Sequence, residues 1–376
     1  MVDPRTLFLA ARELGITLFC GVPDSLLRYF TACISNNDEQ IDHVIVANEG
    51  AGIALATGHH LATGGIGLVY MQNSGIGNAA NPLLSLAARD VYGIPVLLII
   101  GWRGEPGVDD EPQHLVQGRV TLPLLDALEV PHRLLPNDTQ SAVACLQETV
   151  QSASSRSCPE AIIVQHSTFQ RYPTTTDPTG PHHVEREEAV GIVLGQLDST
   201  AIVVSSTGKL SRELYEYRSK NGVLPPRQDF LTVGSMGHAS QIALGLALGQ
   251  PTRRVYCLDG DAALIMHMGS LAISGSLGPR NFTHIVLNNG CHESVGGQRS
   301  AAFDIDIKEI ARACGYRHSV RVSSVPDLHA ALQDLKQIDG PHMVEVVMAT
   351  GSRDDLGRPW TSPSQNKESV MEFLQS

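Results

Sequence analysis

The chain has 376 residues, of which 42% are apolar and 18% are charged, and its 39 Asp and Glu against 27 Lys and Arg give a formal net charge of −12. The composition is typical of a globular protein, and the length predicts two to three domains. The acidic balance, without any run of Lys and Arg, excludes the basic face that nucleic-acid binding needs. The longest apolar stretch, residues 94–100, is far shorter than the roughly 20 residues of a membrane-spanning helix, so we expect no membrane partner.

The first 15 residues place Leu7, Ala10, Ala11 and Leu14 at helical spacing among charged residues. This pattern predicts a surface helix and lacks the apolar core of a signal peptide. The seven cysteines are odd in number, scattered and free of any C-x-x-C motif. We therefore expect reduced thiols and a cytoplasmic protein, without a disulfide framework or zinc site.

Apolar runs then alternate with amphipathic segments along the chain. Runs rich in Val, Ile and Leu on both faces, separated by helices, predict parallel sheets covered on both sides, and hence an α/β fold. The candidate strands are residues 17–20, 43–46, 66–71, 96–100, 161–164, 201–204, 230–233, 254–258, 284–287 and 343–348. Candidate helices between them include residues 51–61, 82–88, 140–151, 240–248 and 325–335.

The rhythm breaks at residues 168–183, which carry three prolines and no helical period. This segment predicts an interdomain linker, which we assign to residues 171–183. The flanking domains, 1–170 and 184–376, each have the size of one doubly wound parallel-sheet domain. The halves share no visible motif, so we expect two similar architectures without a detectable sequence repeat.

A dinucleotide-binding oxidoreductase is one alternative for such a fold. Its G-x-G-x-x-G turn after a strand is absent, because Gly75-Ile76-Gly77 is only a partial match. A P-loop is absent as well, since Gly208-Lys209 lacks the earlier glycine and the following Ser or Thr. The sequence therefore disfavours this alternative.

Polar residues follow two of the predicted strands in the second half. One strand ends in Asp259-Gly260-Asp261 and the next in Asn288-Asn289-Gly290. The carboxyl ends of parallel strands share one edge of a sheet, so we expect Asp261 and Asn289 to be neighbours. Their side-chain oxygens and a backbone carbonyl just beyond Asn289 form a partial octahedral set for Mg²⁺, completed by diphosphate oxygens and water. The helix that starts near Ala262 has free N–H groups for the same diphosphate.

This segment resembles the diphosphate signature of thiamine-diphosphate enzymes, in which Gly-Asp-x is followed after about 25 residues by Asn-Asn. More narrowly, the chain is identified as a member of the phosphonopyruvate decarboxylase family by eight ordered blocks that cover essentially its whole length. The blocks are GVPDSLL (21–27), NEGAGIALATGHHLATG (48–64), NSGIGNAANPL (73–83), RGEPG with DEPQH (103–114), STGKLSRELYE (206–216), VGSMGHAS (233–240), HESVGGQ (292–298) and SRDDLGRP (352–359). Two positions depart from the signature: Ala262 replaces its usual glycine, and Cys291 stands where small residues are common.

The resemblance implies a pyrimidine-binding domain followed by a diphosphate-binding domain, without the middle domain of larger relatives. Glu49 takes the place of the family's activating glutamate, which shares a proton with N1′ of the cofactor's aminopyrimidine ring. Met236 matches the residue that holds the two cofactor rings in a V, and the Gly234 carbonyl accepts from the 4′-amino group. The implied metal ligands are Asp261, Asn289 and the carbonyl of Cys291. The remaining cofactor-binding residues implied are Asn73, Thr207, Gly208, Gly260, Ala262, Ala263 and His292.

For the substrate we nominate Ser25 and His114 as catalytic residues, since either could protonate or orient the product of CO₂ loss. Arg103, Arg299 and Lys209 are candidates for meeting a phosphonate, and the sequence does not choose among them.

The resemblance thus implies a lyase that converts 3-phosphonopyruvate to phosphonoacetaldehyde and CO₂ in phosphonate biosynthesis, with thiamine diphosphate and Mg²⁺. The alternatives are a sulfopyruvate decarboxylase, a thiamine-diphosphate carboligase and a non-catalytic cofactor-binding subunit. Sulfopyruvate decarboxylase typically divides the two halves between two chains, so we expect the fusion to favour phosphonate. The resemblance also implies a homo-oligomer, dimer or tetramer, in which Glu49 of one subunit faces Asp261 of another.

Overall fold

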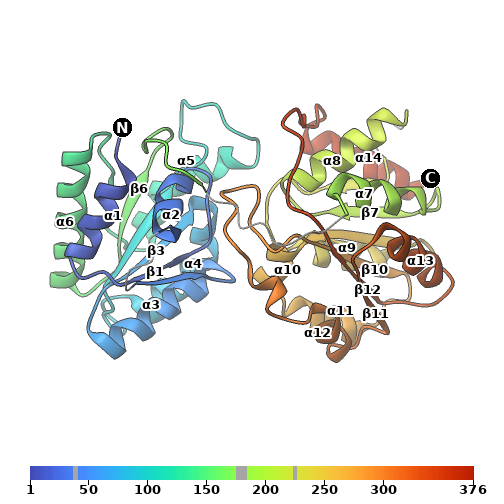
Figure 1. Cartoon of the computed structure of the whole chain (residues 1–376), viewed down its shortest axis with the longest axis horizontal. Helices are drawn as coiled ribbons and strands as arrows, with labels where there is room; N and C mark the ends of the chain where they lie inside the picture. Colours follow the sequence, from blue (N-terminus) through green and yellow to red (C-terminus); the bar gives the residue numbers. More distant parts are fainter. Residues whose placement is uncertain (37–40, 175–183, 223–226) are drawn as a thin grey trace. The chain divides into compact units, whose positions relative to one another are not determined.

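The computed structural model describes residues 1–36, 41–174, 184–222 and 227–376, which form two compact units (Figure 1). The first unit comprises Met1–Thr176 and His292–Arg299, and the second comprises Asp177–Cys291 and Ser300–Ser376. Most of the predicted linker, from residue 175 to 183, lies outside the described residues. In the described part of the chain, no helix combines the length and apolar character that crossing a membrane requires.

The first unit is a six-stranded sheet in the order β2-β1-β3-β4-β6-β5, in which every neighbouring pair is parallel. Its strands are β1 (Leu18–Gly21), β2 (Asp42–Ile45), β3 (Gly67–Gln72), β4 (Val96–Gly101), β5 (His132–Leu134) and β6 (Glu160–Val164). Its helices are α1 (Pro4–Glu13), α2 (Arg28–Ser35), α3 (Glu49–Thr63), α4 (Ile76–Pro82), α5 (His114–Ala127) and α6 (Thr139–Arg156), with a 3₁₀ turn η1 (Asn73–Gly75) and a π-helical turn η2 (Leu83–Ala87).

Helices cover both faces of this sheet (Figure 1). Phe8 of α1, Phe30 of α2 and Leu146 of α6 share one core cluster with β-strand side chains. On the opposite face, α3 approaches so closely that a Cβ on Gly52 would lie 3.0 Å from Val69. The six residues of β4 are all buried, which explains the continuous apolar run that predicted this strand.

The second unit repeats this strand order with different residues. Its strands are β7 (Ile202–Ser205), β8 (Asp229–Leu231), β9 (Val255–Gly260), β10 (Phe282–Asn288), β11 (His318–Val322) and β12 (His342–Val347). The order β8-β7-β9-β10-β12-β11 becomes 2-1-3-4-6-5 when strands are counted from the start of the unit, as in the first sheet. The expectation of two similar doubly wound parallel-sheet architectures is confirmed, although the two halves share no visible sequence motif.

Two apolar clusters, one to each face, flank the second sheet. One draws on α7 (Arg186–Gly195), α8 (Lys209–Lys220) and α13 (Val325–Leu335). The other draws on α9 (Ala239–Gly249), α10 (Asp261–Met266), α11 (Ser270–Leu277), α12 (Ile307–Ala313) and α14 (Pro363–Gln375), with a 3₁₀ turn η3 (Ala301–Phe303).

All ten predicted strands are present, each within two residues of its predicted ends. The sequence did not reveal β5 and β11, each of which is one of the two outer strands of its sheet and is only partly buried. The helix expected over 82–88 begins earlier, as α4, and changes to a π-helical turn after Pro82, which has no N–H to continue the α-helical ladder.

A buried ion pair fastens β8 to α8 in the second unit. Arg218 donates from Nε to Asp229 Oδ2 at 2.8 Å and from Nη2 to Oδ1 at 3.0 Å. Burial raises the pKa of Asp229 and the hydrogen bonds from Arg218 oppose that rise, so the carboxylate depends on this partner.

We predict that Arg218→Met lowers the free energy of unfolding by about 3–5 kcal/mol, because it leaves Asp229 buried without its cation. Urea unfolding followed by circular dichroism measures the loss. The matched control is Arg312→Met on α12, where an exposed arginine meets exposed Glu309 at 3.4 Å and the expected loss is below about 1 kcal/mol. Equal losses in the two variants would contradict the assignment of Arg218 as a buried structural cation.

Candidate active site

The predicted site residues lie where strands end. In the first unit Ser25 follows β1, Glu49 follows β2, Asn73 follows β3 and Arg103 follows β4. In the second unit Thr207 follows β7, and Asp261 and Asn289 follow β9 and β10. The edge formed by these carboxyl ends is where parallel sheets bind ligands, notably beside the reversal of strand order at β1/β3 and β7/β9.

Glu49 is the first residue of α3 and has a buried carboxyl group. The side chain of the N-cap residue Asn48 accepts from Ala51 N, which starts the helix. Glu49 Oε2 accepts a 2.8 Å hydrogen bond from Asn78 Nδ2, and a Cβ on Gly75 would lie 2.5 Å from Glu49 Oε1. Burial raises the pKa of Glu49, as the sequence predicted from an apolar setting. The site therefore favours a carboxyl group that keeps its proton.

The side chain of Asn73 joins the ends of β3 and β4. Its Nδ2 donates to Arg103 O and to Thr121 Oγ1, both at 2.8 Å, and its Oδ1 accepts from Arg103 N at 3.2 Å. These contacts position the backbone of Arg103, and the cofactor contact expected of Asn73 stays a prediction.

Ser25, Arg103 and His114, predicted separately for the substrate, belong to one hydrogen-bonded network. Arg103 Nη1 donates to Ser25 Oγ at 2.9 Å, and its Nε donates to Asp110 Oδ2 at 2.8 Å. His114 Nδ1 lies 2.9 Å from Asp110 Oδ1. The sequence analysis missed Asp110, although it opens the quoted DEPQH block four residues before His114.

Asp24, the residue before Ser25 in the sequence, is fully buried. Its carboxylate accepts from Gln72 Nε2 and from Leu26 N, both at 2.8 Å. Burial raises the pKa of Asp24, and these hydrogen bonds and the charge of Arg103 oppose the rise. A Cβ on Gly101 would lie 2.3 Å from Asp24 Oδ2, so the end of β4 needs glycine to make room for this carboxylate.

In the second unit, the predicted neighbours Asp261 and Asn289 follow paired strands. Leu287 of β10 is registered with Gly260 of β9, which places the next residues on adjoining strand ends. Both side chains are buried. Ser300 links these ends: its Oγ donates to Asp261 Oδ2, and its backbone N donates to Gly290 O at 2.8 Å. Ser300 lies 39 residues beyond Asp261, and no motif marked it in the sequence.

The donor set at this edge fits a hard divalent cation. Burial raises the pKa of Asp261 to about 6, so ionising this carboxyl group has a desolvation cost that a bound cation would relieve. Asn289 Oδ1 accepts from Cys291 N at 3.2 Å, and Cys291 is buried. Carboxylate, amide and carbonyl oxygens are the ligands that Mg²⁺ prefers, so Asp261, Asn289 and the carbonyl of Cys291 suit it. The thiol of Cys291 is not needed for this role.

The loop after β8 has constrained backbone geometry. Thr207 Oγ1 donates to Val233 O at 2.7 Å, which ties the end of β7 to this loop. Ser235 has a φ of 54°, a left-handed conformation that is uncommon for a residue with a side chain. Gly234 and Met236 flank it and are half-buried. Gly208, at the start of α8, has a φ of 98°, which favours glycine.

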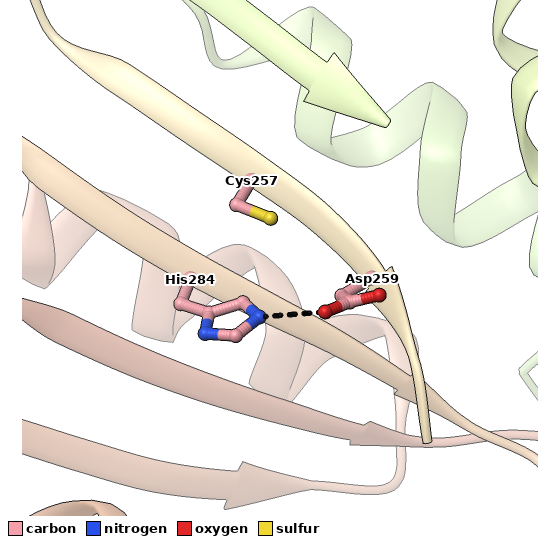
Figure 2. A group of neighbouring side chains, drawn as sticks. All are labelled: Cys257, Asp259 and His284. Carbon is pink, nitrogen blue, oxygen red and sulfur yellow. Dashed lines mark hydrogen bonds and ion pairs between the residues drawn. The ribbon is translucent and has the colours of Figure 1, made fainter. Parts of the chain in front are cut away.

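A buried polar group supports the Gly260 turn from within the sheet. Figure 2 shows Cys257, Asp259 and His284, whose candidate ligand atoms lie within 4.8 Å of one another. Asp259 Oδ2 lies 3.3 Å from His284 Nε2, and its Oδ1 accepts from Gly260 N at 2.9 Å. The other ring nitrogen of His284 lies 3.5 Å from the Tyr316 hydroxyl. Asp259 and His284 are hydrogen-bonded to each other. We therefore assign this group a structural role, which is to hold the backbone that carries Asp261.

The remaining predicted residues take different places. Gly260 caps α10, whose first residues include Asp261, Ala262 and Ala263. His292 and Arg299 belong to the segment that groups with the first unit, not the second. Burial lowers the pKa of His292 to about 4, so its ring is neutral at pH 7.

Of the three candidate phosphonate cations, only Arg103 lies in the described network with Ser25. Arg299 is exposed, and Lys209 is a half-buried first residue of α8.

Comparison with known proteins matches both halves of the chain. The family model "Thiamine pyrophosphate enzyme, N-terminal TPP binding domain" matches residues 5–129. The model "Thiamine pyrophosphate enzyme, C-terminal TPP binding domain" matches residues 206–346. The two matches follow the order expected of a pyrimidine-binding and a diphosphate-binding domain.

Three relatives match nearly the whole chain. The phosphonopyruvate decarboxylase of Streptomyces viridochromogenes is 36% identical over 97% of this chain and 93% of its own. That of Streptomyces hygroscopicus is 36% identical over 99% of this chain and 94% of its own. The sulfopyruvate decarboxylase of Methanosarcina acetivorans is 28% identical over 96% of this chain and 95% of its own.

The third relative corrects one expectation. It carries the name sulfopyruvate decarboxylase and aligns over 95% of its length with a chain that contains both halves. Fusion of the halves therefore does not separate phosphonate from sulfonate substrates, and only the higher identity to the phosphonopyruvate decarboxylases does. The family models and these full-length matches show that the chain belongs to the thiamine pyrophosphate-dependent decarboxylase family that includes the phosphonopyruvate decarboxylases.

Proposed function

We propose that the chain decarboxylates 3-phosphonopyruvate to phosphonoacetaldehyde and CO₂, with thiamine diphosphate and Mg²⁺. The observation that carries this proposal is the 36% identity to two phosphonopyruvate decarboxylases over nearly full length, against 28% to a sulfopyruvate decarboxylase. The buried Glu49 and Asp261 support it, because each suits its expected role. A non-catalytic cofactor-binding subunit would not need the raised pKa of Glu49.

The two units divide the cofactor's needs. When bound, thiamine diphosphate supplies a carbon nucleophile for the 2-keto group and an acceptor for the electrons that leave with CO₂. Asp261, Asn289 and the carbonyl of Cys291 would hold Mg²⁺ at the diphosphate. Glu49 would hold and exchange a proton at N1′ of the aminopyrimidine, because burial keeps its carboxyl group protonated at higher pH than usual.

The network of the first unit supplies polar groups for the substrate. Ser25 Oγ accepts from Arg103, which leaves its own O–H free to donate to the substrate. His114 faces Asp110 through Nδ1, so Nε2 is the atom for moving a proton. Arg103, which is paired with Asp110, is the cation of this network that we propose to meet the phosphonate group.

We also propose a cytoplasmic homo-oligomer, dimer or tetramer, in which Glu49 of one subunit and Asp261 of another serve the same cofactor. The seven free thiols are consistent with a reducing compartment. Light scattering tests the assembly, and an active monomer would contradict it.

We predict CO₂ release from phosphonopyruvate at a kcat/KM at least about tenfold above those for sulfopyruvate and pyruvate. Turnover should require added thiamine diphosphate and Mg²⁺ after both are removed by dialysis against a chelator. Parallel CO₂ assays with the three acids provide the measurement. A preference for sulfopyruvate would establish the sulfonate alternative. An added aldehyde that diverts the product into a ligated ketone would favour the carboligase.

We predict that Glu49→Gln lowers kcat by at least about 100-fold, because an amide cannot exchange the proton that a carboxyl group can. Cofactor affinity, measured by calorimetry, should stay close to that of the unmodified chain. Glu148→Gln is the control, since Glu148 is an exposed partner of Arg133 at 3.0 Å and should leave kcat unchanged. Full turnover by Glu49→Gln would remove Glu49 from the chemistry.

We predict that Asp261→Ala weakens Mg²⁺-dependent cofactor binding by more than about 100-fold at pH 7.5, because it removes the charged metal ligand. With a pKa of about 6 in the metal-free protein, Asp261 is mostly protonated at pH 5, so the difference between the two proteins should shrink there. Calorimetry at both pH values measures it. Asp334→Ala, at an exposed position on α13, is the control. Unchanged affinity in Asp261→Ala would place the metal elsewhere.

A further inference from the structure

The carboxylate of Asp110 accepts five hydrogen bonds, all from the first unit. Its Oδ2 accepts from Arg103 Nε at 2.8 Å and Gly104 N at 2.7 Å. Its Oδ1 accepts from Arg103 Nη2, from Glu111 N at 2.7 Å and from His114 Nδ1 at 2.9 Å. Partial burial raises the pKa of Asp110, but these donors outweigh it and hold that pKa well below its usual range. Asp110 therefore acts as a fixed anion.

The first consequence concerns His114. An ionised carboxylate only accepts hydrogen bonds, so the contact with Asp110 requires a proton on Nδ1. The ring is buried at the first turn of α5, and the backbone behind it is tightly packed, because a Cβ on Gly104 would lie 2.0 Å from His114 O. Nε2 is then the nitrogen available to take up and release a proton.

The second consequence concerns Arg103 and Ser25. Asp110 holds the guanidinium group by two of its nitrogens, which fixes the plane of the group and neutralises part of its charge. The third nitrogen, Nη1, donates to Ser25 Oγ at 2.9 Å. A guanidinium group has no acceptor, so Ser25 must accept here and its hydroxyl proton points to another partner. The orientation of the Ser25 hydroxyl thus depends on Asp110 through Arg103.

We propose that Asp110 is the positioning residue of the substrate site: it fixes His114 as the Nδ1–H tautomer and, through Arg103, sets the Ser25 hydroxyl as a donor. The inference rests on the proposed function, in which Ser25 and His114 meet the substrate. Asp110 itself takes no part in proton transfer. A purely structural role, in which Asp110 only closes the loop between β4 and α5, is the alternative that the experiment must separate.

The first test reads the tautomer directly and needs no turnover. Long-range ¹H–¹⁵N spectra of the full chain labelled in histidine, with the His114 signals identified by their loss in His114→Gln, report which nitrogen of the neutral ring carries the proton. We expect the Nδ1–H tautomer in the unmodified chain and a shift toward Nε2–H, which histidine prefers in water, in Asp110→Ala. The Nε2–H tautomer in the unmodified chain, or unchanged spectra in Asp110→Ala, would overturn the proposal.

The second test separates positioning from loop closure by kinetics. We expect Asp110→Ala to lower kcat for phosphonopyruvate by about 10- to 100-fold while cofactor affinity stays unchanged. Asp109→Ala, its exposed neighbour, is the matched control and should stay within about twofold. In a His114→Gln background the further loss on Asp110→Ala should be much smaller, because a positioning residue acts through its partner. Full additivity of the two losses would contradict the proposal.

The two tests also distinguish the failure of each idea. An unmodified chain with the Nδ1–H tautomer and no turnover of phosphonopyruvate would refute the proposed function and support the positioning role of Asp110. Turnover with the opposite tautomer would do the reverse.

Discussion

The parallel pairing of strands is the constraint on which the candidate site depends. Within each six-stranded sheet the paired strands all run in one direction, so every carboxyl end opens on one edge. The segments that follow the strands at this edge of the first sheet contain Ser25, Glu49, Asn73 and Arg103. The same edge of the second sheet carries Asp261. The order of the strands therefore brings residues that are far apart in the sequence to the same edge of each sheet. Helices close both faces, which leaves this edge for polar chemistry.

Burial then gives the carboxyl groups at these edges different properties. Glu49 Oε2 accepts a side-chain hydrogen bond from Asn78, and desolvation by burial raises the pKa of its carboxyl group. Asp110 accepts five hydrogen bonds and stays ionised. Asp229, at the amino end of β8, is fully buried and forms a structural ion pair with Arg218. The same chemical group therefore has a raised pKa, stays ionised or forms a structural ion pair according to the groups around it.

The sequence predicted what depends on local pattern and missed what depends on packing. Central strands such as β4 and β10 are buried throughout, so their apolar runs were visible. The half-exposed outer strands β5 and β11 were missed, although the outer strand β2, which is also half-exposed, was predicted. Asp261 and Asn289 could be paired because each directly follows a strand. Ser300 and Asp110 could not be assigned roles, because their partners are set by how loops fold back on strand ends. The cofactor contact expected of Asn73 stays a prediction, and the structure adds that its amide group contacts Arg103 and Thr121.

The buried free cysteines can report local unfolding of the two sheets. Cys20 lies in β1 of the first sheet and Cys257 in β9 of the second, and both thiols are buried. Burial raises the pKa of Cys20 to about 12 and holds that of Cys257 well above its usual range, so the reactive thiolate is scarce in the folded state. A thiol reagent reaches either one only after local unfolding. The alkylation rates at Cys20 and Cys257 therefore measure how often each sheet opens locally.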